Sequence, residues 1–191
     1  MLINSIMIEN GKIFELIKSD FERYSCYNST FLSFLKTYLT VPGARFMFWF
    51  RLASSNSLFL RLLFGGIARF LLRHYRFKYG IEIYRGTQIG PGFYIGHFGA
   101  IVVNRDAIIG ENCSIHHCVT IGIAGSGTNR GVPVIGDNVD INPGAKVFGK
   151  IVIGDNVTIG ANAVVNKSVG DNAVVAGVPF KIIKFKDYVN K

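Results

Sequence analysis

The second half of the sequence repeats small aliphatic residues with a period of six. Two ladders, offset from each other by two positions, carry only Ile, Val, Ala or Cys at all 24 of their positions. Glycine often follows a ladder residue, as in Ile89–Gly90 and Ile153–Gly154, where a tight corner needs a residue that lacks Cβ. This hexapeptide repeat is typical of a parallel β-helix, which is the fold we predict. The ladder residues are Ile83, Ile89, Ile95, Ile101, Val103, Ala107, Ile109, Cys113, Ile115, Val119, Ile121, Ile135, Val139, Ile141, Ala145, Val147, Ile151, Ile153, Val157, Ile159, Ala163, Val165, Val169 and Val175.

The repeat is interrupted once, between Ile121 and Ile135. The intervening segment, 122–134, is rich in glycine but lacks the Gly-Lys-Ser/Thr of a phosphate-binding loop, so we expect no nucleotide site in it. A loop that leaves a rigid coil is a common place for function. A plain surface insertion is the alternative.

Residues 1–80 differ from the repeats in charge and in hydrophobic period. They hold eleven basic and four acidic residues, whereas residues 81–191 hold ten and eight. Apolar residues recur at spacings of three and four, which predicts amphipathic helices in 12–24, 31–39, 45–53 and 58–78. Pro42–Gly43 separates two of them. We therefore expect a helical region (1–80), a β-helix domain (81–180) that carries the loop 122–134, and a C-terminal tail (181–191).

The segment 41–78 holds seven basic residues and no acidic one, interleaved with aromatic residues such as Phe46, Phe48, Trp49 and Phe50. One interpretation is that these helices pack on the β-helix while the arginines reach water. The other is peripheral contact with the inner face of a membrane, with aromatic residues in lipid and arginines at head groups. No apolar stretch is long enough to span a bilayer, so a cytoplasmic protein is the default expectation. Nucleic-acid binding is not expected, because no recognised motif is present.

Histidines are the candidate catalytic groups. His97 lies 19 and 20 residues before the adjacent pair His116–His117. Adjacent residues of a strand point to opposite faces, so we expect that the pair does not share one ion and that no metal is bound. The sequence has no Gly-x-Ser-x-Gly nucleophile elbow. A histidine that acts as a general base is therefore the most economical catalytic device.

The stretch from Glu82 to Ile183 resembles the serine acetyltransferase-like branch of the left-handed β-helix acyltransferases. The resemblance rests on IGPGFYIGHFGAIVVN, AIIGENCSIHHCVTIG, NVDINPGAKVFGKIVIGDNVTIGANAVV and AVVAGVPFKII. The helices, with PGARFMFWFRLA, look like those of relatives in polysaccharide biosynthesis, such as the colanic acid acetyltransferases. The resemblance implies a left-handed β-helix, a homotrimer and acetyl-CoA in clefts between neighbouring chains. It makes His97 the general base and Glu82 the acidic residue that supports it.

The sequence departs from true serine acetyltransferases at two places. The Asp that precedes the catalytic histidine is replaced by Gly96, and the Arg-His pair of the interrupting loop aligns with Gly131–Val132. Arg130 would replace the loop arginine only with a slip of one residue. A zwitterionic serine needs charged partners, so our main hypothesis is O-acetylation of a sugar in a bacterial surface polysaccharide. The acceptor would be a glycan or a nucleotide- or lipid-linked sugar. A serine O-acetyltransferase of cysteine biosynthesis and a non-enzymatic trimeric scaffold are the alternatives.

Further site residues are predicted along the β-helix. We expect direct transfer, in which His97 removes the acceptor proton and His117 binds the acceptor, although His117 as an ordinary corner residue is an equal alternative. Small residues would let the pantetheine arm of acetyl-CoA approach the backbone. Lys181 would meet the CoA phosphates, or else be a solvated lysine of the tail. The small residues are Pro143, Gly144, Ala145, Gly160 and Ala161.

Overall fold

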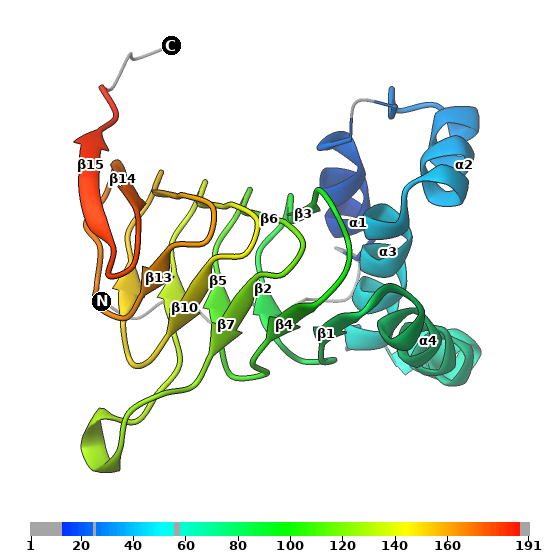
Figure 1. The fold of residues 1–191 in the computed structure, drawn as a ribbon. Coiled ribbons are helices and arrows are strands. Elements are labelled where there is room, and N and C mark those ends of the chain that lie inside the picture. Colours follow the sequence, from blue (N-terminus) through cyan, green and yellow to red (C-terminus); the bar gives the residue numbers. More distant parts are fainter. Residues whose placement is uncertain (1–12, 25, 56–57, 188–191) are drawn as a thin grey trace.

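The computed structural model describes residues 13–24, 26–55 and 58–187, and within them the side chains of all but 58–61. Residues 1–12 of the predicted helical region and 188–191 of the predicted tail lie outside the described residues, as do the side chains of Phe59 and Arg61. The described chain forms a parallel β-helix with helices gathered at one end (Figure 1). The predicted fold class is therefore confirmed.

The helices form where the apolar period predicts them. Helix α2 begins after Thr30, whose side chain accepts a hydrogen bond from the backbone N–H of Ser33, an N-cap that stabilises the first turn. Pro42 then occupies the first turn of α3, where its missing N–H costs nothing. Helix α4 runs without a break through Gly65–Gly66. The helices are α1 (Ile13–Glu22), α2 (Phe31–Thr40), α3 (Pro42–Ser54) and α4 (Leu58–Tyr79).

The strands stack into three sheets, which the chain visits in turn as it winds along the β-helix. All neighbouring strands pair in parallel except the last two, which pair antiparallel at the end away from the helices. Sheet A holds β1 (Ile81–Ile83), β4 (Ile101–Val103), β7 (Thr120–Gly122), β10 (Lys146–Phe148) and β13 (Val164–Val165). Sheet B holds β2 (Gln88–Ile89), β5 (Ile108–Ile109), β8 (Val134–Ile135) and β11 (Val152–Ile153). Sheet C holds β3 (Tyr94–Ile95), β6 (Ser114–Ile115), β9 (Asp140–Ile141), β12 (Thr158–Ile159), β14 (Ala173–Ala176) and β15 (Lys181–Phe185).

The core of the β-helix is made by the two aliphatic ladders, since every ladder residue is buried. Burial of each Ile or Val of the ladders contributes roughly 1.5–3 kcal/mol, so the repeat itself supplies much of the driving force for the coil. Asparagines such as Asn138 and Asn156 take positive φ at the corners, a conformation that Asn tolerates better than most residues.

A buried ion pair attaches the helices to the first coil. Arg51 of α3 donates to both carboxylate oxygens of Asp20 of α1, at 2.8 and 3.0 Å, and both side chains are almost fully buried. Arg51 also donates to the carbonyls of Ile89 and Gly90, while the backbone N–H of Phe93 donates to Asp20. Every charged group is thus satisfied, and the pair fixes α1 and α3 against the corner that follows β2.

The aromatic residues of α3 pack inward and do not face a membrane. Phe46 and Phe50 are buried in the core that continues into the β-helix, and Trp49 packs against it and donates to the hydroxyl of Tyr38. The membrane interpretation is therefore wrong for α3. In the described part of the chain, no helix is long and apolar enough to cross a bilayer.

Candidate active site

One edge of the β-helix, where the chain passes from sheet C to sheet A, carries most of the predicted site residues. The four turns at this edge, which we call the C–A corners, are 96–100, 116–119, 142–145 and 160–163. Backbone hydrogen bonds join each corner to the next: Cys118 N–H to the Gly99 carbonyl, Gly144 N–H to that of His117, and Asn162 N–H to that of Pro143. The histidines and the predicted small cofactor residues at these corners therefore form one column along the coil axis, whereas Glu82 and Lys181 lie outside it.

The first coil is two residues longer than the next one, and the extra residues widen its C–A corner. Sheet A pairs Ile83 with Val103 but then Val103 with Ile121, so the first coil contains two extra residues. Ile95 and Ile115, which pair in sheet C, are also 20 residues apart, whereas Val103 and Ile121 are 18 apart. The two extra residues therefore lie between Ile95 and Val103. Gly99 and Ala100 take positive φ to make the wider turn. This turn leaves the side chain of His97 exposed, where a ligand can reach it.

Three histidines gather at this corner. The ring centroid of His97 lies 5.8 Å from that of His116 and 5.8 Å from that of His117. The strand rule behind the expectation for His116 and His117 does not apply, because both residues follow the end of β6 and belong to a corner. The described residues nevertheless contain no group of three His, Cys, Asp or Glu side chains with metal-ligand geometry.

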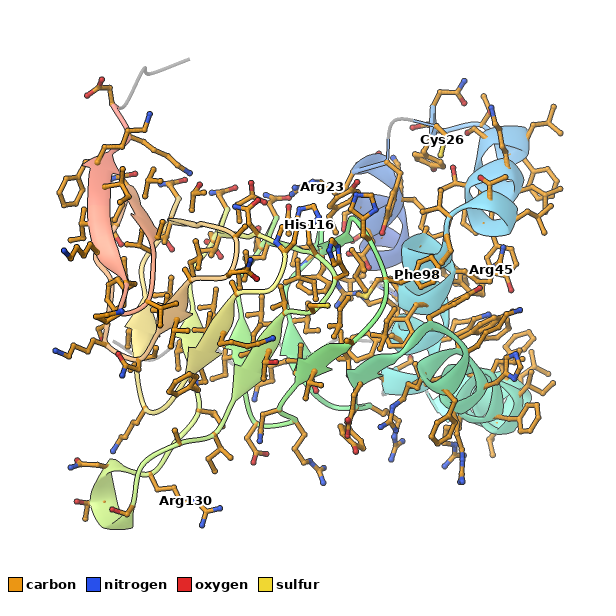
Figure 2. The ribbon with its side chains drawn as sticks, in the orientation of Figure 1. Arg23, Cys26, Arg45, Phe98, His116 and Arg130 are labelled. Atoms are coloured by element: carbon orange, nitrogen blue, oxygen red, sulfur yellow. The ribbon has the colours of Figure 1, made fainter. Side chains whose placement is uncertain are left out.

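His116 is the most enclosed of the three rings. Burial lowers the pKa of its imidazole below the ordinary value of 6.5, the nearby imidazoles of His97 and His117 lower it further, and only the carboxylate of Asp140 acts in the opposite direction. Its Nδ1 is buried without a hydrogen-bond partner among the described residues. Figure 2 shows the ring at the corner near Arg23 of the α1 end. His116 is thus a neutral neighbour of His97 at pH 7.

The ring of His116 explains why residue 96 is glycine. A Cβ on Gly96 would lie 2.5 Å from both Cε1 and Nδ1 of His116, and 3.0 Å from Cε1 of Tyr94. An Asp at this position, as in true serine acetyltransferases, would collide with the imidazole. With the ring of His116 in this position, residue 96 has no room for a side chain.

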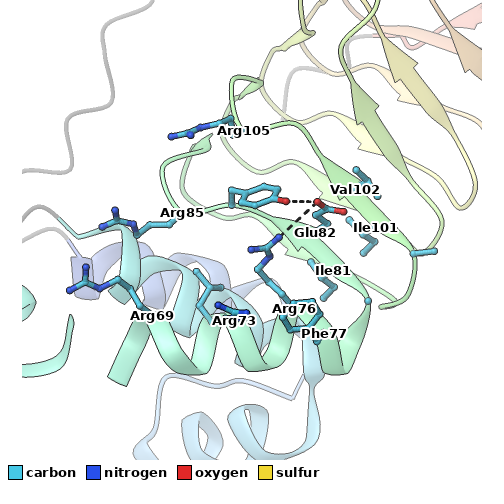
Figure 3. Close-up of a pocket in the computed structure, with 14 residues that line it drawn as sticks. Arg69, Arg73, Arg76, Phe77, Ile81, Glu82, Arg85, Ile101, Val102 and Arg105 are labelled. Carbon is cyan, nitrogen blue, oxygen red and sulfur yellow. Dashed lines mark hydrogen bonds and ion pairs between the residues drawn. The ribbon is translucent and has the colours of Figure 1, made fainter. Parts of the chain in front are cut away.

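Glu82 projects from β1 and is held by two partners that the sequence analysis missed. Its Oε1 accepts a hydrogen bond of 2.5 Å from the hydroxyl of Tyr84 and lies 3.9 Å from the guanidinium of Arg76 (Figure 3). The same guanidinium lies 3.9 Å from the centre of the Tyr84 ring. No hydrogen bond or ion pair joins Glu82 to His97 in the described chain, so its supporting role stays a prediction.

The predicted cofactor residues fall into two groups. Pro143, Gly144, Gly160 and Ala161 lie at the C–A corners with some surface exposed. Gly144 has a φ of +78° and its Cβ would lie 1.9 Å from Oδ1 of Asn162, so it must be glycine. Ala145, by contrast, is fully buried in the ladder, so its side chain does not line a surface groove, and its predicted contact with the cofactor stays a prediction.

Arg130 and Lys181 are not brought to the histidines of their own chain. Arg130 projects from the loop that leaves the coil after β7. In Figure 2 this loop lies at the lower left, well away from His116 in the upper middle. A bridge between Ala124 and Gly131 and a hydrogen bond from Lys150 Nζ to the carbonyl of Thr128 support this loop. Lys181 is exposed on β15, at the opposite end from α1–α4.

The comparisons with known proteins agree with this architecture. A family model described as "Bacterial transferase hexapeptide (six repeats)" matches residues 133–167. The serine acetyltransferase of Staphylococcus xylosus is 44% identical over 118 residues, which cover 62% of this chain and 55% of that protein. This chain is a hexapeptide-repeat protein similar to serine acetyltransferases. It spans about half the length of the curated relatives it matches.

The similarity to serine acetyltransferases extends to the fold of the helices. The crystal structure of serine acetyltransferase from Brucella abortus strain S19 matches with a TM-score of 0.75 and 29% identity, over 93% of this chain and 71% of that one. A structure of the same enzyme in complex with coenzyme A matches with a TM-score of 0.74 and 27% identity, over 93% and 70%.

These relatives correct the main functional hypothesis. A sugar acceptor from polysaccharide biosynthesis is wrong, because the relatives found by sequence and by structure are serine acetyltransferases. The hypothesis gave too much weight to Gly96, which the packing of His116 explains without any change of acceptor.

Proposed function

We propose that this protein is an acetyl-CoA-dependent serine O-acetyltransferase of cysteine biosynthesis. The observation that carries the proposal is the exposed His97 on the lengthened corner of a β-helix that is similar to serine acetyltransferases. An exposed His97 can be reached both by the hydroxyl of serine and by the thioester of acetyl-CoA.

In the proposed mechanism, His97 acts as the general base. Its imidazole removes the proton of the serine hydroxyl as that oxygen attacks the thioester carbonyl carbon of acetyl-CoA. The carbon–sulfur bond then breaks, and the proton passes from the imidazolium to the leaving thiolate. The products are O-acetylserine and the free thiol of CoA. Because His116 stays neutral, it does not oppose the positive charge that His97 gains during the reaction.

Acetyl-CoA would bind along the C–A corners. Pro143, Gly144, Gly160 and Ala161 have small or absent side chains there, so an extended pantetheine arm can lie against the backbone. Backbone N–H groups near the arm would stabilise the oxyanion that forms on the carbonyl. His117 borders the same corners and is the candidate to bind the acceptor.

We also infer a homotrimer with sites shared between chains. Arg130 is exposed on a loop that lies far from the histidines of its own chain, so a carboxylate held near His97 would meet Arg130 only from a neighbouring chain. The same reasoning applies to Lys181 and the CoA phosphates. The bridge between Ala124 and Gly131 holds the loop that carries Arg130, which supports a contact between Arg130 and a neighbouring chain.

The test uses the purified full chain with acetyl-CoA and L-serine. Release of the CoA thiol is followed with a thiol reagent, and O-acetylserine is identified by mass spectrometry. His97→Ala should lower turnover by about 10²–10⁴-fold, whereas His74→Ala, an exposed histidine of α4, should leave it unchanged. Thiol release without O-acetylserine would contradict the acceptor, and no release with any acceptor would indicate a scaffold.

A further inference from the structure

A cavity rich in arginine lies between α4 and the first strands of sheet A. Its volume is about 820 Å³, and arginines line it from two sides (Figure 3). Arg69, Arg73 and Arg76 come from α4, whereas Arg85 and Arg105 come from the turns that follow β1 and β4. We call this cavity the arginine pocket.

The charge of the arginine pocket is poorly compensated. Glu82 is the one acidic residue among those that line it, and it is shared between Arg76 and the hydroxyl of Tyr84. Arg105 lies 4.0 Å from the carboxylate of Asp106, its one ion-pair partner among the described residues, and both side chains are largely exposed, so this pair is weak. Arginines brought together with so few carboxylates repel one another, and an anion that binds among them relieves that repulsion.

Individual arginines also keep donors free for a ligand. In the described part of the chain, Arg69 uses its Nε on the carbonyl of Gly65, which leaves its two terminal nitrogens. The guanidinium of Arg73 lies 5.8 Å from the centre of the Phe77 ring and has no hydrogen bond or ion pair to any other described residue. The Nε of Arg76 is buried with no partner among the described residues, a costly state that an acceptor atom of a ligand would remove.

We propose that the arginine pocket binds a small ligand that carries two linked phosphate groups, such as a diphosphate or its ester. A guanidinium forms paired hydrogen bonds with phosphate oxygens, and five of them suit a multiply charged anion better than a single carboxylate. The cavity has the volume of a small-molecule site. The arginines converge from α4 and from the β-helix on one hollow, whereas a flat bilayer contact needs them on one side only.

The ligand has room for an organic part. A second cavity of about 520 Å³ shares Glu82, Tyr84, Val102 and Arg105 with the arginine pocket and continues over β7 to Ile123. Val102 and Ile123 present exposed aliphatic side chains to it, so an apolar group attached to the phosphates can extend along sheet A. This binding site goes beyond the proposed acetyl transfer and does not depend on it.

The experiment measures binding of pyrophosphate and of inorganic phosphate to the full chain by isothermal titration calorimetry at low salt. Pyrophosphate should bind more tightly than phosphate. Arg69→Gln with Arg73→Gln should weaken pyrophosphate binding by at least about tenfold, since charge-assisted hydrogen bonds are lost. Lys167→Gln with Lys184→Gln removes the same charge from exposed positions of the β-helix and should change binding less than about twofold. Equal losses in both variants, or no binding to the wild type, would overturn the proposal.

Two further arms separate the sources of phosphate. Vesicles of phosphatidylglycerol and of phosphatidylcholine are sedimented with the same variants, and the Michaelis constant for acetyl-CoA is measured in parallel. The proposal expects no preference for the anionic vesicles and an unchanged Michaelis constant. Vesicle binding that depends on Arg69 and Arg73, without pyrophosphate binding, would assign the arginines to a membrane surface. A Michaelis constant that rises with the loss of pyrophosphate binding would assign them to the acetyl-CoA site. Either result would refute a separate ligand site.

Discussion

Adding a single methyl group at Gly96 tests whether His116 fixes the shape of the first C–A corner (96–100), which we call the histidine corner. The Cβ of Gly96→Ala would lie 2.5 Å from two atoms of the imidazole, whereas non-bonded carbon atoms are stable at about 3.5–4.0 Å. The ring must therefore move by about 1 Å. The φ of Gly96 is not positive, so the alanine adds no backbone strain of its own. Overpacking of this kind costs about 1–3 kcal/mol of unfolding free energy.

The double mutant isolates this contact. With His116→Ala already in place, the methyl group of Gly96→Ala no longer meets the imidazole, and only Cε1 of Tyr94, 3.0 Å from that Cβ, has to give way by a few tenths of an ångström. Alanine in place of glycine offsets this smaller cost, because it stabilises a chain by about 0.4–1 kcal/mol through the unfolded state. We therefore expect Gly96→Ala to destabilise the wild type and to be neutral or stabilising in the His116→Ala background. The coupling free energy between the two sites should be about 1–3 kcal/mol.

Urea denaturation at pH 7.5 measures all four proteins of the cycle. Gly170→Ala is the matched control, because a Cβ at Gly170 meets no atom within 4 Å. The control should show no coupling to His116→Ala. An equal cost of Gly96→Ala in both backgrounds would show that the imidazole does not constrain residue 96, and the explanation of this glycine would then fail.

Three further results are expected. Asp20→Asn should destabilise the fold by about 3–5 kcal/mol in urea denaturation, because Arg51 stays buried without its charge partner; a loss below 1 kcal/mol would contradict the docking role of the pair. Because burial lowers the pKa of His116, the imidazole takes up a proton more readily in the unfolded chain than in the folded one. The unfolding free energy should therefore fall as the pH drops below 6.5 and level off below the pKa of the folded state. An identical pH profile in His116→Ala would refute this. Mixed trimers of His97→Ala and Ala161→Trp chains should regain activity if each site draws on two chains, and verified mixed trimers without any activity would exclude that arrangement.

The ladder could be predicted from the sequence because its physics is local. Each of the two ladders places a small apolar residue inside the coil at every sixth position. The period alone therefore identifies the inward-facing side chains. The lengthened corner also left a signal, since Ile101 and Val103 are both aliphatic and mark the point where one ladder shifts to the other. That shift falls directly after His97.

The errors come from residues whose neighbours lie on another coil. The strand rule failed for His116 and His117 because Ile115 ends β6 and both histidines lie in the turn that follows. Ala145 was named as a cofactor residue for its small size, although its position in the ladder already indicated that its side chain is buried. The arginine pocket could not be predicted at all, because it forms only when α4 lies against β1 and β4.

The histidine corner and the arginine pocket meet at the same stretch of backbone. Ala100 ends the first C–A corner, which carries His97, and it also lines the arginine pocket. Glu82, the predicted support of His97, lines that pocket as well and is held there by Arg76. An anion that draws Arg76 toward itself would release Glu82 from its ion pair, while the buried Asp20–Arg51 pair keeps the other helices in place. The helices at the end of the β-helix are therefore more than a cap, because α4 supplies the charges that surround the first strand of the coil.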